Sequence, residues 1–248
     1  MAELEFYSAS PLRIRADLAA AHARAWAHIA RPGTWWDGVA RVAIAAETRQ
    51  APQCALCRRR QEALSPLTIE GAHDSLGQLP PPAIEVVHRV RTDPGRLGES
   101  WYRNVIARGL SAEQYVEIVS VVAHVIAIDT MARGLGLGPW PMPDPQPGLP
   151  TRRRPVRARS GGAWVPWLEP ADASGDEAAI YPNDRPPANI MKAMSLVPGE
   201  VRSFFDLVSH QYLPGEVMRD FAHEYRAISH AQIELLAARV SALNRCLY

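Results

Sequence analysis

The residues best suited to chemistry in this chain are two cysteines, Cys54 and Cys57. Pro52 precedes them where prolines commonly open helices, so we expect a short helix that carries both thiols. A thiol near a helix N-terminus lies beside unpaired backbone N–H groups and the positive end of the helix dipole, which stabilise its thiolate. The second thiol follows three residues later on the same face. This spacing predicts a redox pair in which Cys54 is the more acidic thiol and Cys57 the less exposed one.

Two other interpretations of the thiol pair stay open. Two cysteines at this spacing can form half of a zinc site, but no second ligand pair follows at a suitable spacing, so we expect no metal. The two residues could also be ordinary buried thiols. With Cys246 the chain has three cysteines, too few for a disulfide framework, which indicates a reducing cytoplasm.

Three side chains are candidates for moving protons near the thiols. Glu47 lies seven residues before the first cysteine, about two helical turns away. Glu117 and His124 are seven residues apart in the most apolar stretch, where a buried acid is costly unless it is hydrogen-bonded or functional. The alternatives are a solvated Glu47 and a structural Glu117–His124 pair. His88 is interpreted as a structural helix histidine.

Composition excludes several functional classes. The 248 residues include 27 basic and 26 acidic side chains, which gives no electrostatic basis for binding nucleic acid or an anionic membrane. Charged residues interrupt the most apolar stretch, residues 115–137, so a buried helix is favoured over a membrane span. The N-terminus has no pattern of a signal peptide.

Apolar periodicity and capping signals predict an all-α fold. Capping boxes are expected at Ser111 and Ser229, each with glutamine three residues later. We expect helices over about residues 11–29, 36–50, 82–90, 98–107, 111–133, 198–211, 215–226 and 229–243.

A proline-rich segment divides the helices into an expected first unit, residues 1–138, and a second unit, residues 189–248. The connection, residues 139–188, is long for an irregular segment and is either a linker or an arm packed on a surface. Its three tryptophans favour the arm. Its basic run, residues 152–159, is favoured as a solvated face over an RNA or phosphate site.

We expect the two units to be related, because residues 41–54 align without gaps with residues 233–246. Each stretch is an alanine-rich helix that leads into a cysteine. This helix and cysteine unit resembles the alkylhydroperoxidase D and carboxymuconolactone decarboxylase superfamily. Glu234 precedes Cys246 by twelve residues, the spacing of that family.

The resemblance implies an alkylhydroperoxidase D-like helical bundle that assembles as a homodimer or a higher homo-oligomer. Redox-active members reduce hydroperoxides or relay electrons through the C-x-x-C pair without a cofactor, and a glutamate and a histidine serve as their proton relay. The first unit departs from this pattern, with Val42 at the glutamate position and Gln61 at the histidine position. The second unit stops before its partner cysteine, which a selenocysteine codon read as a stop after Tyr248 would explain.

We therefore expect a thiol-dependent peroxidase or disulfide oxidoreductase that acts on a hydroperoxide or a protein disulfide. Cys54, Cys57, Glu47, Glu117 and His124 are the expected catalytic residues, and Glu234 and Cys246 match the family secondarily. The alternatives are a helical scaffold of little or no activity and a lyase resembling the decarboxylase branch.

Overall fold

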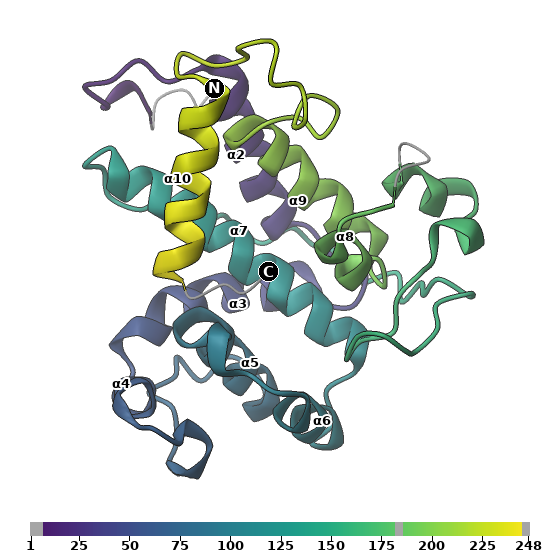
Figure 1. Cartoon of the computed structure of the whole chain (residues 1–248). Helices are drawn as coiled ribbons and strands as arrows, with labels where there is room; N and C mark the ends of the chain where they lie inside the picture. The colour runs from purple at the N-terminus through teal and green to yellow at the C-terminus, as the bar shows by residue number, and fades with distance from the viewer. Residues whose placement is uncertain (1–6, 182–185, 245–248) are drawn as a thin grey trace.

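The computed structural model describes residues 7–181 and 186–244, and within these ranges it contains helices and no strand beyond an isolated bridge between Arg159 and Trp167. The expected all-α class is confirmed. Figure 1 shows α7 running through the middle of the molecule, with α4, α5 and α6 on one side of it and α2 and α9 on the other. The helices are α2 (Ala16–Ala30), α3 (Gly38–Gln50), α4 (Ala55–Glu62), α5 (Pro81–Thr92), α6 (Glu99–Ala107), α7 (Ala112–Gly134), α8 (Asn189–Met194), α9 (Pro198–Gln211) and α10 (His230–Leu243).

Helix α7 forms the centre of the core and packs against α3 and α5. Its N-terminus carries the expected capping box, in which Ser111 and Gln114 exchange hydrogen bonds. By length and composition α7 could cross a membrane, but 56 % of its most apolar window is buried inside the molecule. This burial is what a core helix requires, as the sequence predicted.

Two expected helices differ from the structure. The first helix begins at Ala16 rather than near residue 11, after Arg15 in an extended conformation. Residues 215–226 form turns instead of a helix. There the Asp220 carboxylate accepts hydrogen bonds from the Ala222 N–H and the Tyr225 hydroxyl. Such local bonds give the backbone an alternative to the helical ladder.

The proline-rich segment lies against the helices. Trp140, Val165 and Leu168 are buried, and the Gln146 and Arg152 backbone N–H groups donate to the α2 end and to the loop that follows it. Its basic residues remain largely exposed. The segment thus has the packing expected of an arm, with its arginines in solvent.

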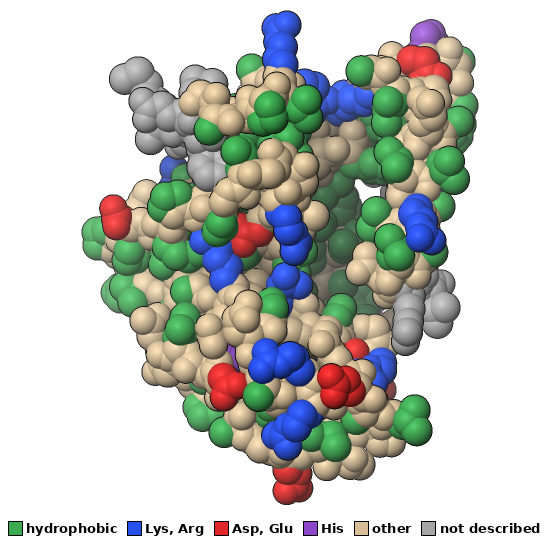
Figure 2. Space-filling model, turned by 90° about the vertical axis from the view of Figure 1, so that its left-hand side faces the viewer, with side chains coloured by type: hydrophobic (Ala, Val, Ile, Leu, Met, Phe, Trp, Pro, Cys, Tyr) green, Lys and Arg blue, Asp and Glu red, His purple; other side chains and the backbone are tan. Residues whose placement is uncertain are grey.

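The helices that follow the proline-rich segment are packed unevenly. Helix α9 lies along α2 and also contacts α7, whereas α10 buries only His230 and Ile233 among its residues. Leu236, Val240 and Leu243 of α10 are more than half exposed. Figure 2 shows hydrophobic side chains on this part of the surface, which a hollow separates from the body of the molecule.

Candidate thiol site

The thiol pair lies at a sharp change of direction between two helices. Helix α3 ends at Gln50 and a 3₁₀ turn, Ala51–Gln53, follows with Pro52 in its first turn. Cys54 then adopts an extended conformation as the N-cap residue of α4, and Cys57 lies in the first turn of that helix. The expected position at a helix start is therefore correct.

Both thiols are buried. Cys54 is 0 % exposed and Cys57 is 2 % exposed, so the expectation that Cys57 is the less exposed thiol is wrong. The loop that follows α4 closes over the pair, since the Asp74 N–H donates to Cys54 Sγ at 3.3 Å and the Asp74 carboxylate accepts from the Ala55 N–H at 2.7 Å. A short stretch of loop thus covers the sulfur atoms and the start of α4 together.

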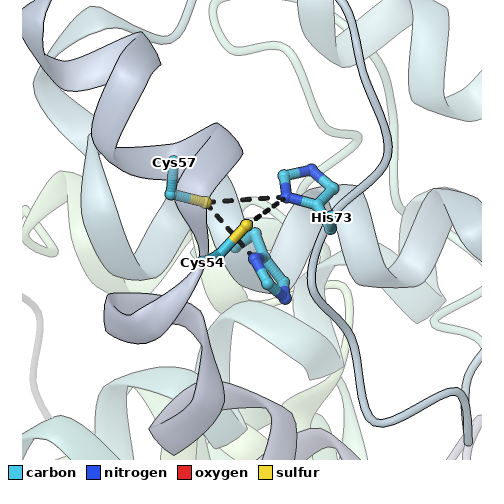
Figure 3. Close-up of side chains that lie close together, drawn as sticks. Cys54, Cys57 and His73 are labelled. Carbon is cyan, nitrogen blue, oxygen red and sulfur yellow. Dashed lines mark hydrogen bonds between the residues drawn. The ribbon is translucent and has the colours of Figure 1, made fainter.

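His73, from the same loop, faces both sulfur atoms. Its Nδ1 lies 3.5 Å from Cys54 Sγ and 3.6 Å from Cys57 Sγ, and Figure 3 shows the two sulfurs directed toward this nitrogen. Its Nε2 donates to Glu85 at 2.8 Å. Glu85 is itself fixed by Arg60 at 3.0 Å and by the Trp101 indole N–H at 2.9 Å.

His88, from α5, lies beside His73, with the two ring centroids 4.2 Å apart. Its Nδ1 lies 3.3 Å from Cys57 Sγ, and its Nε2 donates to Glu47 at 2.6 Å. The Glu47 carboxylate also accepts from the Leu76 N–H at 3.0 Å and the Ser75 hydroxyl at 3.2 Å. Glu47 therefore joins the thiol site through His88, in an orientation set by the covering loop.

The electrostatics favour the ionised forms of Cys54, His73 and Glu85 despite burial. Burial opposes ionisation of Cys54, but hydrogen bonds from the Cys57 and Asp74 backbone and from His73 lower the pKa of its thiol below the usual value. Burial likewise opposes the His73 cation, yet the thiols and Glu85 raise its pKa to about 10. Burial also opposes ionisation of Glu85, but hydrogen bonds from His73 and Trp101 and the charge of Arg60 hold its pKa at about 2. Burial lowers the pKa of His88 in spite of the Glu47 carboxylate.

The structure places Glu117 and His124 in a second buried cluster, built around Arg41. The Arg41 guanidinium donates to Glu117 and, at 2.8 Å, to Glu200. Glu200 also accepts from His28 at 2.9 Å. Burial raises the pKa of Glu117 even with Arg41 beside it.

His124 belongs to the same region of α7. It bonds to the Ser120 carbonyl at 2.7 Å and to the Ser203 hydroxyl at 3.0 Å. Burial lowers its pKa to about 4. Among the described residues, neither Glu117 nor His124 makes a hydrogen bond to the thiol site.

Of the two residues that match the family secondarily, Glu234 and Cys246, the structure describes only Glu234, and it lies apart from the thiols. Glu234, on α10, accepts a hydrogen bond from the Tyr212 hydroxyl and pairs with His230 at 3.4 Å. Cys246 lies outside the described residues, so its expected role stays a prediction.

Sequence reasoning missed two of the closest neighbours of the thiols. His73 has no periodicity that could have singled it out, because it lies in an irregular loop 16 residues after Cys57. His88 was interpreted as structural, although it makes the bond that connects Glu47 to the pair. The signal that could have found them is the combination of residue types, because two histidines follow the two cysteines at wide spacing.

No protein-family model, no curated protein and no solved structure matches the chain significantly.

Proposed function

We propose that the protein is a thiol-dependent peroxidase or disulfide oxidoreductase that uses Cys54 and Cys57. The observation that carries the proposal is the bonded chain from Cys57 Sγ through His88 to Glu47, with distances of 3.3 Å and 2.6 Å. It supplies a thiol, an imidazole and a carboxylate in the order that activation of a nucleophile requires. A glutamate and a histidine also form the relay that the family resemblance implies, although at other positions of the chain, which supports the proposal.

In the proposed reaction one thiolate attacks an oxygen of a hydroperoxide. A sulfur–oxygen bond forms, the oxygen–oxygen bond breaks, and the alcohol leaves with one proton. The second thiol then attacks the resulting sulfenic acid, so that a disulfide forms and water leaves. Two thiols and one hydroperoxide thus yield one disulfide, one alcohol and one water, and an external dithiol or protein thiol restores the pair.

The contacts of the two sulfurs suggest separate roles. Cys57 contacts both histidines, and His88 can accept its proton and share the resulting charge with Glu47. Cys54 lies beside backbone N–H groups that stabilise its thiolate. We expect Cys57 to attack the hydroperoxide and Cys54 to resolve the sulfenic acid. A reducing compartment such as the cytoplasm would keep both thiols available.

The burial of the two thiols favours a second candidate function, a helical scaffold in which the cluster is structural. Neither sulfur can meet a hydroperoxide unless the loop around His73 and Asp74 moves away from α4. A scaffold would keep this loop closed and leave the thiols unreactive.

Thiol titration under native conditions separates the two candidates. The fully reduced protein, treated with a chelator to remove any metal, is exposed to a slight excess of hydrogen peroxide, then denatured, alkylated and analysed by mass spectrometry. The redox proposal expects the peptide that spans Cys54 and Cys57 to lose two hydrogen atoms and to recover them with a dithiol. It also expects Cys57→Ser to abolish reaction with peroxide and Cys54→Ser to stop at the sulfenic acid. Two alkylatable thiols after peroxide treatment would reject it and leave the scaffold.

A further inference from the structure

Four side chains of the thiol site direct one donor atom each to a common point. The sulfur atoms of Cys54 and Cys57 and one ring nitrogen each of His73 and His88 all lie within 4.8 Å of one another. Three of these four residues are buried and the fourth is half-buried. They come from the start of α4, the covering loop and α5, so only the folded chain brings them together.

The separations fit the coordination shell of a tetrahedral metal ion. In zinc sites the Zn–S distance is about 2.3 Å and the Zn–N distance about 2.0–2.1 Å, so a tetrahedral angle places sulfur and nitrogen about 3.6 Å apart. Three of the four sulfur–nitrogen separations here are 3.3, 3.5 and 3.6 Å, and the fourth, between Cys54 and His88, lies within 4.8 Å. His73 Nδ1 is nearly equidistant from both sulfurs, which a shared metal explains better than one N–H bond to one acceptor.

The outer contacts of the histidines match those of metal ligands. Each Nε2 donates to a carboxylate, His73 to Glu85 at 2.8 Å and His88 to Glu47 at 2.6 Å. A ligating histidine characteristically donates its other ring N–H in this way, which sets its tautomer and the direction of its free lone pair. Both imidazoles are therefore oriented with Nδ1 toward the sulfurs. The Asp74 N–H at 3.3 Å from Cys54 Sγ adds a stabilising bond to a thiolate.

We propose that Cys54, Cys57, His73 and His88 bind one Zn²⁺ ion as a closed tetrahedral site. Two thiolates and two imidazoles are a ligand set that selects zinc in this geometry, and two thiolates neutralise its charge inside the protein. With four protein ligands the site has no open position for a substrate, as in structural zinc sites. The ion would fasten the loop around His73 to the beginning of α4 and to α5.

The zinc site requires only that the two thiols are reduced, and it does not depend on the redox proposal. Zinc binding does compete with the redox reaction, because a disulfide between Cys54 and Cys57 removes both thiolate ligands. Zinc-loaded protein should therefore react more slowly with peroxide than metal-free protein. If peroxide oxidises the zinc-bound pair, two thiolates lose two electrons to the peroxide, two protons are taken up, two waters form and the ion is released.

Metal binding to the full-length chain tests the site directly. The protein is reduced, stripped of metal with a chelator, and titrated with Co²⁺ and then Zn²⁺ under anaerobic conditions. We expect one Co²⁺ per chain, with the intense visible bands of tetrahedral cobalt and a thiolate-to-cobalt charge-transfer band. One equivalent of Zn²⁺ should displace the cobalt and remove both the visible bands and the charge-transfer band. A reduced wild-type chain that shows neither band, or that binds Co²⁺ without thiolate bands, overturns the proposal.

Variants identify the ligands and their outer partners. Cys54→Ser, Cys57→Ser, His73→Ala and His88→Ala should each weaken Zn²⁺ binding more than about a hundredfold, because outer partners alone are worth about 10–100-fold. Glu85→Gln, which changes an outer partner, should weaken Zn²⁺ binding by about 10–100-fold. His223→Ala, at an exposed histidine, is the matched control and should bind Zn²⁺ like the wild type. Unchanged spectra in the four ligand variants would place the ion elsewhere and reject the site. A chain that binds zinc but never forms the disulfide would retain the zinc site and reject only the redox proposal.

Discussion

Glu47 of α3 and His88 of α5 share a 2.6 Å hydrogen bond, and both side chains are completely buried. This bond connects two helices that pack against each other on α7. It also determines which nitrogen of His88 faces Cys57, because Nε2 is engaged by the carboxylate. The pair therefore has a structural role and, in the proposed reaction, an orienting one.

Replacement of Glu47 by glutamine should slow the reaction of the thiols with peroxide about a hundredfold near neutral pH, the usual worth of general-base assistance. Glutamine has nearly the same shape but cannot stabilise a cationic His88. Stopped-flow kinetics of the reduced, metal-free protein measure the rate, and Glu62→Gln, at an exposed site on α4, is the control. An unchanged rate in Glu47→Gln would mean that the thiols work without this relay.

Replacement of Gly33 by alanine should destabilise the fold through the second cluster. A Cβ atom there would lie 1.7 Å from a Glu117 carboxylate oxygen and 2.5 Å from the Arg41 guanidinium. Both side chains are fully buried and cannot move aside freely, so we expect a loss of about 1–3 kcal/mol in the free energy of unfolding.

Urea unfolding measures that loss. Gly199→Ala is the matched control, because a Cβ at Gly199 meets nothing within 4 Å, and its unfolding free energy should stay close to that of the wild type. Equal midpoints for Gly33→Ala and the wild type would show that the Arg41 cluster is less tightly packed than the structure has it.

Acid should begin to destabilise the protein at a pH above the range in which carboxylates titrate. Burial lowers the pKa values of both His22 and His124 to about 4, against about 6.5 in an unfolded chain. Between these values the unfolded state binds more protons, so stability is retained above pH about 6.5 and lost as the pH falls toward 4. Each histidine contributes up to about 3 kcal/mol to this loss.

Chemical denaturation at several pH values between 7 and 4.5 (in steps of about half a unit) tests this dependence. His22→Gln lacks one of the two titrating groups and should show a shallower decline of unfolding free energy than the wild type. Identical slopes for the two proteins would assign the acid sensitivity to other groups.

A homodimer is expected to cover the exposed apolar face of α10. Leu236, Val240 and Leu243 are 57–65 % exposed, and an apolar stripe of this kind on a helix commonly marks a protein interface. Light scattering at micromolar concentration should give about twice the 27.3 kDa chain mass. Val240→Glu should shift the protein toward the monomer, whereas a wild-type mass of one chain would rule out a stable dimer.

Much of the fold was predictable from short-range features of the sequence. Ser111 and Ser229 both form the expected capping boxes, because a capping box needs only residues three positions apart. The thiols lie at a helix start for the same reason. The expected helix over residues 215–226 failed where the Asp220 side chain makes competing local bonds, which periodicity does not report.

Residues a few positions apart are enough to predict the helical class, the capped ends of the long helices and the position of Cys54 and Cys57 at a helix start. The surroundings of the thiols depend instead on packing between distant segments. His73 and His88 are 16 and 31 residues from Cys57, and they meet it because α5 packs on α7 and the loop after α4 folds back over that helix. Glu117 shares the buried character of Glu47, but packing directs it to Arg41. Residue type and spacing are local in the chain, whereas the burial of a side chain and the identity of its partner are properties of the packed helices.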